Sequence, residues 1–402
     1  MNPRRSIVRR PLRWGGPLLL LAALFALQLA RPAWSARLEA WTVDARFRLR
    51  GPQSPQYPIV IVAIDEDSFQ LLGDLQGENI RTWPRARWAA LIHTLAAAQP
   101  RFIGLDVVFD TPGWDPGGDA ALAQALAEAG NVVLPAHQLQ RAAGGYTLIT
   151  TSPPLPALAQ SAAGVGIAGF PADADGAIRR LTLLYPGETR AQPAFALVLA
   201  TLARGAPVAI PPADLAPDLS LLLNFRGPEA TFTTVSLYDV LTGATPPATF
   251  RDAFVLVGYT TLLEQDRHLT PFGVLPGVEL QATALHTLLA GDWLRAPPAW
   301  FPPLAAALAG LSALVLANLA RPGLGLTLLG TLLLAYLITG GAAFIYAGYL
   351  LPLVPPVAAA LLVYGAALAE RLTFAERDKR RLRARFASIM SAERLRAVMD
   401  HW

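Results

Sequence analysis

Hydrophobic and polar positions divide the chain into one long mixed segment and four apolar runs, one near the N-terminus and three near the C-terminus. A helix needs about 20 apolar residues to cross the hydrocarbon core of a bilayer, and each run reaches or approaches this length. The first run, Gly15–Ala30, is short, but Pro32–Ala36 extends it and brings Trp34 to an interfacial position. The predicted membrane segments are 15–36, 298–320, 324–345 and 348–369.

Two alternatives stay open for these runs. Ala33-Trp34-Ser35-Ala36 offers the small residues of a signal-peptide cleavage site. The first run is therefore either an uncleaved anchor, which we favour, or a cleavable signal peptide, and both versions export the segment that follows. The other alternative is that one of the late runs is a buried core helix of a folded domain.

Basic residues gather at the two ends of the chain and set the predicted orientation. Residues 1–37 carry seven arginines and no acidic residue, and residues 370–402 carry nine basic and five acidic residues. Because short basic segments stay on the cytoplasmic side of a membrane, we expect 1–14, Arg321 and 370–402 to be cytoplasmic. The long segment 37–297 then lies outside the cytoplasmic membrane, and both termini lie inside.

The exported segment alternates strand-like and helix-like stretches. Continuous β-branched runs, such as Pro58–Ile64, are typical of parallel strands buried on both faces. Strand–helix–strand order implies right-handed crossovers and a parallel sheet. We therefore predict an α/β domain, mainly a parallel sheet with flanking helices in three layers. The expected strands are 58–64, 102–110, 131–135, 220–225 and 253–258, and the expected helices are 87–98, 120–129, 195–204, 236–241 and 278–290.

The stretch Asp173-Ala174-Asp175-Gly176 carries a turn signal, because an Asp-Gly pair between apolar runs is typical of a hairpin. It also has the first spacing of a calcium-binding loop, but the later ligands and the closing glutamate are missing. We predict a hairpin turn here and no calcium site.

Composition removes several classes of function. Hydrophobic residues make up 53% of the chain and charged residues 15%, against about 25% charge in soluble domains, which agrees with a membrane protein. The chain has no cysteine, which excludes disulfides, thiolate metal sites and cysteine nucleophiles. Scattered histidines argue against zinc, and neither a nucleophile elbow nor a phosphate-binding glycine loop occurs. We expect no metal, no cofactor and no nucleic-acid partner.

Acidic residues follow two of the predicted parallel strands and form the candidate ligand site. Ligands of open α/β sheets bind beyond the carboxyl ends of the strands, and carboxylates gathered there can hold a divalent cation or a basic ligand. The alternative is that they cap helices or pair with nearby arginines. Arg226 follows a later strand and is a candidate for an anion or for an ordinary ion pair. The candidate ligand-binding residues are Asp65, Asp67, Arg87, Asp106, Asp110 and Arg226, and no catalytic residue is assigned.

An ordered series of short motifs runs through the exported segment from about residue 40 to residue 294. The series comprises Asp44–Pro52, Val62–Ser68, Trp83–Arg87, Ile103–Phe109, Asp175–Arg180, Asn224–Pro228, Phe254–Thr260, Thr270–Gly273, Pro276–Ala282 and Leu288–Gly291. Each motif is weak alone, but their order is specific. With these motifs the chain resembles the CHASE2 domain, the extracytoplasmic sensor module of bacterial membrane receptors. That family has one helix before the sensor and three after it, as in the topology predicted above.

The resemblance implies a multi-pass sensor in the bacterial inner membrane that binds a small-molecule or periplasmic ligand, contacts lipids and forms a homodimer. Receptors of this family lead to a cytoplasmic output domain, often an adenylate or guanylate cyclase and otherwise a protein kinase. The stretch Arg383–Leu395 resembles the linker before a cyclase domain, although Ala392 stands where that linker typically has proline. Because the chain ends at residue 402, soon after the last membrane segment, we expect no cyclase activity from it.

The basic segment 370–402 is the predicted cytoplasmic linker. As a helix that continues out of the membrane, it would transmit a register or rotation change to an output domain. As a basic flank, it would contact anionic lipid headgroups. The residues assigned to signal transmission are Arg371, Arg377, Arg381, Arg385 and Phe386.

We predict that the chain senses an extracytoplasmic signal and transmits it across the membrane, as the sensory part of a CHASE2 receptor of the adenylate cyclase type. An exported, membrane-anchored α/β hydrolase or metal enzyme is one alternative, but the sequence shows carboxylates without a base–nucleophile set. A transporter would need polar residues inside its spans, where Asn318 and a few threonines are nearly all there is. A further alternative is a stand-alone sensor or scaffold that works with a separate cytoplasmic output protein.

Overall fold

The computed structural model describes residues 15–30, 33–76, 80–143, 146–187, 190–262 and 266–387. They form two compact units. Val43–Ala296 is the sheet domain, and the described parts of Met1–Thr42 and Pro297–Trp402 are the helical unit. The boundary falls inside helix α2 (Ala33–Arg50), between Thr42 and Val43, so α2 contributes residues to both units.

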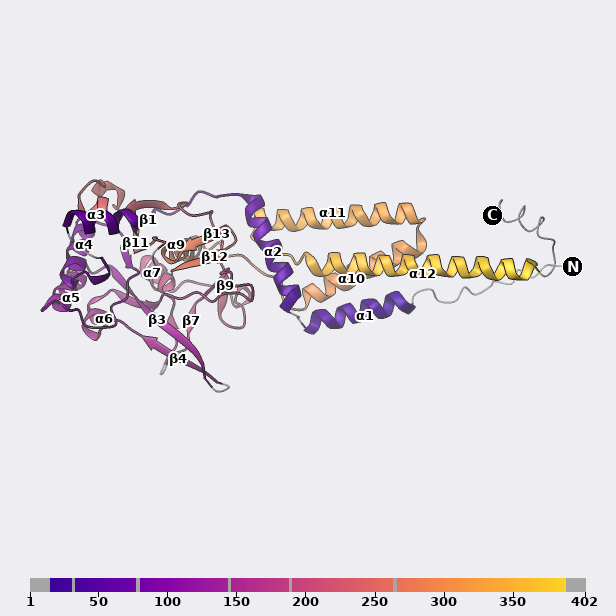
Figure 1. Ribbon diagram of the computed structural model, residues 1–402, viewed down its shortest axis with the longest axis horizontal. Coiled ribbons are helices and arrows are strands. Elements are labelled where there is room, and N and C mark those ends of the chain that lie inside the picture. The colour runs from indigo at the N-terminus through magenta and orange to yellow at the C-terminus, as the bar shows by residue number, and fades with distance from the viewer. Residues whose placement is uncertain are drawn as a thin grey trace. The chain divides into compact units, whose positions relative to one another are not determined.

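The sheet domain is built on a seven-stranded sheet (Figure 1). The strand order is β10-β1-β11-β2-β3-β4, and β5 pairs with β3. Every pair is parallel except β3–β4, so the predicted parallel core is confirmed. The strands are β1 (Ile59–Ile64), β2 (Phe102–Leu105), β3 (Val132–Ala143), β4 (Tyr146–Ser152), β5 (Gly164–Ile167), β10 (Thr233–Ser236) and β11 (Phe254–Tyr259).

The centre of the sheet consists of β1 and β11. All six residues of β1 are buried, and so are the first five of β11. The two strands pair in parallel from Ile59 opposite Phe254 to Ile64 opposite Tyr259. Both faces of a parallel sheet are covered by helices, which is why these strands are continuous apolar runs in the sequence.

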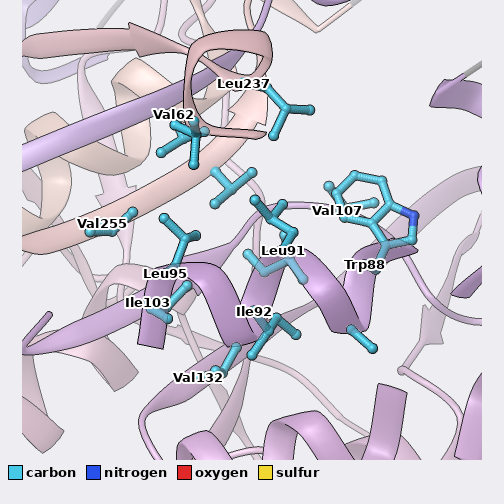
Figure 2. Close-up of a cluster of buried hydrophobic side chains, with 14 of the residues drawn as sticks. Val62, Trp88, Leu91, Ile92, Leu95, Ile103, Val107, Val132, Leu237 and Val255 are labelled. Carbon is cyan, nitrogen blue, oxygen red and sulfur yellow. The ribbon is translucent and has the colours of Figure 1, made fainter. Parts of the chain in front are cut away.

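One face of the sheet is covered by α3 (Glu66–Gln76), α4 (Arg85–Ala97), α5 (Gly118–Ala129) and α8 (Leu237–Leu241). Alternate residues of β1, β2, β3 and β11 point into the apolar core on this face, because successive side chains of a strand lie on opposite sides. Figure 2 shows Val62, Ile103, Val132 and Val255 of the sheet together with Trp88, Leu91, Ile92 and Leu95 of α4.

The opposite face is covered by α7 (Phe195–Arg204) and α9 (Gly277–Ala290). Glycine in β2 permits the close approach of α7, because a Cβ at Gly104 would lie 2.6 Å from the Leu256 side chain and 3.0 Å from the Phe195 ring. Helices therefore lie on both sides of the sheet, as the predicted three layers require.

The remaining elements of the sheet domain are short. They make three two-stranded pairs, β6–β9, β7–β8 and β12–β13, all antiparallel. Their bounds, with those of the short helices, are α6 (Pro156–Ser161), β6 (Arg180–Thr182), β7 (Leu184–Tyr185), β8 (Gln192–Pro193), β9 (Ser220–Leu222), β12 (Arg267–Thr270), β13 (Gly273–Pro276) and the 3₁₀ turns Ile80–Thr82, Pro212–Asp214 and Pro247–Thr249.

Two local predictions were wrong. The run 102–110 was expected to be one strand, but β2 ends at Leu105 because Val107 N–H donates back to Leu105 O at 2.9 Å and turns the chain out of the sheet. The turn at 173–176 exists, with Gly176 at φ +83°, but it does not close a hairpin. Its neighbours pair elsewhere, β5 with β3 and β6 with β9.

The helical unit contains α1 (Gly15–Ala30), α10 (Phe301–Leu319), α11 (Pro322–Ala347) and α12 (Val354–Ala387). Among the described residues, three helices are long and apolar enough to cross a membrane: Phe301–Leu319, Pro322–Ala347 and Val354–Arg381. Helices α10 and α12 pack through small side chains, including Ala313, Ala317, Ala360 and Ala367.

Two predicted segment boundaries differ from the helices. The first segment was expected to continue to residue 36, but α1 ends at Ala30, and Trp34–Arg50 is bent from it by 79°. The last was expected at 348–369, but α12 begins only at Val354 and continues to Ala387. Pro352 precedes this start, and Pro355 and Pro356 lie in the first turn, where proline is tolerated because its missing N–H has no helical partner.

Candidate functional site

A pocket of about 350 Å³ lies at the carboxyl ends of the parallel strands. It is bounded by residues that follow β2 and β5, by the middle of β3, by the end of β11, by residues at the start of β12, and by the start of α9. Open parallel α/β sheets place their ligands at this edge. The lining residues are Asp106, Val107, Val108, His137, Ala168, Gly169, Phe170, Tyr259, Asp266, His268, Gly277 and Gln281.

Asp106 is the first residue after β2. Its backbone N–H donates to Val257 O of β11 at 2.8 Å, and the chain then turns out of the sheet at Val107. The half-buried carboxyl is thereby held at the edge of the sheet. Burial raises the pKa of Asp106 to about 7, and the nearby Asp266 carboxylate adds to the shift. This carboxyl therefore changes protonation near neutral pH.

Asp266 is the second carboxylate of the pocket. Its Oδ1 lies 2.9 Å from Nε2 of His268, and its backbone carbonyl accepts from Gly277 N–H at 3.0 Å. A Cβ at Gly277, the first residue of α9, would overlap an oxygen of the Asp266 carboxylate, so any larger residue there would force this carboxylate to move. The carboxylate thus lies at a helix N-terminus, where the helix dipole favours negative charge.

His137 of β3 completes the titratable groups of the pocket. Burial lowers the pKa of His137, and the carboxylates Asp266 and Asp110 oppose this shift. No group of three or more histidine and acidic side chains placed to hold a metal ion occurs within the described part of the chain.

The predicted candidates do not gather at one place, and of the six only Asp106 is among the residues that line this pocket. Asp65 accepts from Ser68 N–H and from Ser236 Oγ, both at 2.9 Å, and so caps α3. Asp110 is exposed and accepts from Ser152 Oγ at 2.7 Å. Asp67 and Arg87 are exposed on α3 and α4. The expected convergence fails because β11 separates β1 from β2.

Arg226 lies in a different place, in a buried polar network. It forms an ion pair with Asp292, and its Nε lies 3.2 Å from Nδ1 of His286. Asn224 donates to the carbonyl of Asp292 at 3.0 Å and accepts from Arg50 Nη1 at 2.7 Å. Burial lowers the pKa of His286 to about 4, and the Arg226 guanidinium adds to the shift.

A second buried arginine forms the cluster that we call the Arg179 clasp, made of Arg179, Asp44, Asp173 and Asp175. Arg179 is 4% exposed. Its guanidinium binds Asp44 through Nε and Nη2, both at 2.8 Å, and donates from Nη1 to Asp173 and Asp175, both at 2.9 Å. The turn at 173–176 thus supplies two carboxylates, and α2 supplies the third.

Aromatic packing extends this contact along α2. Phe47 is 1% exposed and meets Phe225 and Phe272 edge-on, with ring centroids 5.7 and 5.9 Å apart. Four of the sequence motifs therefore meet around residues 43–50 of α2, a surface that we call the α2 face. These motifs are Asp44–Pro52, Asp175–Arg180, Asn224–Pro228 and Thr270–Gly273.

Sequence reasoning missed most of the pocket and the α2 face. Asp106 could be found because it directly follows a recognisable strand. Asp266, His137, His268 and Gln281 come from segments whose proximity depends on the strand order, which the chain order does not reveal. For the α2 face, the sequence motifs contain the charged and aromatic residues that form it. The sequence does not show which of these residues contact each other.

The predicted linker residues lie on α12. Arg371 Nη1 donates to Ala317 O and Ala320 O, both at 2.8 Å, at the last turn of α10. The Arg377 guanidinium lies 6.0 Å from the centroid of the Phe374 ring, and Arg381 is exposed. The backbone of Arg385 and Phe386 is helical, but their side chains lie outside the described ones. The predicted cyclase-like linker Arg383–Leu395 lies mostly outside the described residues.

Comparison with known proteins gives one match. A family model described as the CHASE2 domain matches residues 18–320. No curated protein and no solved structure matches the chain at a significant level.

Proposed function

The chain belongs to the CHASE2 domain family, an extracellular sensor domain, and from this premise we propose that it is the sensory part of a membrane receptor. In this proposal the sheet domain lies outside the bacterial inner membrane, and the pocket at its strand ends takes a small-molecule or periplasmic ligand. Four helices, α1 and α10–α12, cross the membrane, and both termini are cytoplasmic. The output is of the adenylate or guanylate cyclase type, and the receptor acts as a dimer.

The helical unit supports the membrane part of the proposal. Three of its helices have the length and apolar composition of membrane spans. Helix α1 reaches this length and composition only together with α2, as a bent pair. The arginine-rich end of α12 follows its apolar part directly, as a cytoplasmic flank would.

The observation that carries the proposal is the double attachment of α2. In the helical unit, Glu39 of α2 binds the start of α12: its carboxylate accepts from Leu353 N–H at 3.0 and 3.1 Å and from Val354 N–H at 2.9 Å. Negative charge at a helix N-terminus satisfies amides that have no helical partner. In the sheet domain, Asp44 of the same helix is held by the Arg179 clasp. One helix therefore connects the sensor fold to the helix that leads to the linker.

The predicted orientation is tested by cysteine accessibility, because the natural chain has no cysteine. Thr94 is exposed on α4 and Lys379 is exposed on α12. In spheroplasts, a membrane-impermeant maleimide should label Thr94→Cys at once and Lys379→Cys only after permeabilisation. The reverse pattern would place the sheet domain in the cytoplasm and end the proposal.

Transmission through α2 is tested by hydrogen exchange of the full chain in lipid nanodiscs. Between residues 352 and 356 only Leu353 and Val354 carry amide hydrogens, because the other three residues are proline. Glu39→Ala should accelerate exchange of these two amides several-fold, since it removes their acceptor. Asp44→Asn acts in the other unit, yet it should change the same amides if α2 passes the perturbation on.

The matched control is Asp110→Asn, which removes an exposed carboxylate of the sheet domain that contacts Ser152 instead of α2. It should leave Leu353 and Val354 at the wild-type rate. A wild-type rate in Asp44→Asn, with a clear effect of Glu39→Ala, would show that α2 does not link the two attachments.

A further inference from the structure

The exposed side of α2 carries an apolar stripe. Trp34, Leu38 and Trp41, all in the helical unit, are 52%, 48% and 67% exposed. They follow one another at intervals of four and three residues, which places them along one side of the helix. We call these three residues the α2 stripe. Large apolar side chains in such a continuous row are unusual on a surface that faces water.

The opposite side of α2 is also partly apolar, so the sequence alone does not show that the stripe forms a separate apolar side of the helix. Val43 and Phe47 are 8% and 1% exposed and pack into the sheet domain. The apolar residues of α2 therefore fall on two sides with different surroundings, and only the structure separates them.

The charges around the stripe have one sign. The exposed residues of α2 include Arg37 and Arg48 and no acidic residue. The two acidic side chains, Glu39 and Asp44, are half-buried and are bound to α12 and to Arg179. Tryptophan and arginine beside leucine are the residues that prefer the boundary between lipid headgroups and acyl chains.

The surroundings of α2 in the helical unit set its depth. The bend of 79° turns α2 away from the direction of the apolar helix α1. The Glu39 carboxylate meets the first amides of α12, which is itself long and apolar enough to span. A spanning helix begins at the membrane interface, so the contact with Glu39 holds this part of α2 at that interface.

We propose that α2 is an interfacial helix whose stripe inserts into the lipid surface. Lipid is a better occupant than a second copy of the chain, because the stripe adjoins the spanning helices and is flanked by arginines that would face each other across a two-fold interface. The inference rests on α10–α12 crossing a membrane. It gives the helix that joins the sensor to α12 a contact with the bilayer.

The test is site-directed spin labelling of the full chain in nanodiscs of neutral and anionic phospholipid. One nitroxide is attached at a time to Leu38→Cys or Trp41→Cys, with Thr94→Cys on exposed α4 as the aqueous reference and Leu332→Cys on exposed α11 as the lipid reference. Collisions with oxygen report lipid, and collisions with a water-soluble nickel chelate report water. The oxygen-to-nickel ratio at positions 38 and 41 should exceed that at 94 several-fold and lie below that at 332.

Three results would overturn the inference. A nickel accessibility at 38 and 41 equal to that at 94 would place the stripe in water. Shielding from both reagents, with spin–spin broadening between copies, would show that a second copy covers it. A water-like ratio at 332 would show that the bundle is not in lipid. That last result also contradicts the proposed membrane placement, whereas the first two leave it intact.

Discussion

The sheet domain contains two charged regions that balance their charges differently. At the α2 face, two buried arginines are matched by carboxylates: Arg179 by three aspartates and Arg226 by Asp292. In the pocket, Asp106 and Asp266 lie with two histidines, and no arginine or lysine is among the described residues that line it.

Protonation follows this difference. Hydrogen bonds from Arg179 hold the pKa of Asp175 below its usual range, so this carboxylate stays ionised throughout the neutral pH range. In the pocket, burial and the neighbouring Asp266 raise the pKa of Asp106 to about 7. The α2 face therefore has fixed charges, and the pocket has charges that can change.

The two regions suit different roles: the α2 face holds elements of the fold together, and the pocket can respond to a ligand or a proton. Charge pairs around a buried arginine hold two elements in a defined geometry, as Arg179 holds α2 against the turn at 173–176. A carboxyl with a perturbed pKa in a pocket is typical of a functional site. A bound ligand or a proton can supply the positive charge that the protein does not place beside this carboxylate.

The largest expected effect is at the clasp. Arg179→Met leaves the half-buried carboxylates of Asp44, Asp173 and Asp175 together without their cation. Loss of one partner from a buried ion cluster costs about 3–5 kcal/mol. We expect the melting temperature of the sheet domain to fall by on the order of 10 °C, measured by near-ultraviolet circular dichroism of the full chain in nanodiscs.

Arg180→Met is the matched control for this change. Arg180 is the next residue in the chain, but its side chain is 34% exposed and its Nε lies 4.0 Å from Asp173. Exposed pairs contribute about 0–1 kcal/mol, so the control should melt within a few degrees of the wild type. Equal effects of the two substitutions would mean that the clasp is no stronger than a surface ion pair.

Much of the sheet domain could be predicted from local sequence. The helix expected at 195–204 matches α7 (Phe195–Arg204), and the apolar runs of β1 and β11 are the two central strands. Their periodicity and flanking turn residues identify them without tertiary information. The strand order could not be predicted, since β11 inserts between β1 and β2. The end of β2 was also missed, because Val107 and Phe109 are buried, as strand residues would be, but lie outside the sheet.

The candidate site was less accessible to sequence reasoning. A strand end followed by aspartate is a correct signal at Asp106, but the same signal at Asp65 marks a helix cap that binds Ser68 and Ser236. The two cases look alike in sequence, because capping and ligand binding use the same residue types at the same place in α/β folds. Only the partners of each carboxylate distinguish them.

A smaller effect, specific to the pocket, is expected from Asp106→Asn and should depend on pH. The pKa of Asp106 is about 7 in the folded chain, against an ordinary value of 3.8 for an aspartate. Between these values the folded state binds more protons than the unfolded state, so its stability falls as pH rises from about 4 to about 7 and then stays level. Asparagine carries no charge and removes this loss.

The variant and the wild type should therefore have similar stability near pH 4, and the variant should be more stable above pH 7. A pKa shift of one unit corresponds to about 1.4 kcal/mol. The stability difference should be smaller than the full shift implies, because water reaches the pocket and the polar side chains of Asp266, His137 and His268 also line it. We expect a difference of about 1–2 kcal/mol at pH 8, measured as melting temperature at a series of pH values.

Two other groups with shifted pKa values are present in both chains, so their contributions cancel in the difference. Burial raises the pKa of Glu279 to about 7 and lowers the pKa of His286 to about 4. If the difference for Asp106→Asn did not vary with pH, the pocket carboxyl would be ionised like those of the clasp, and the contrast between the two regions would not hold.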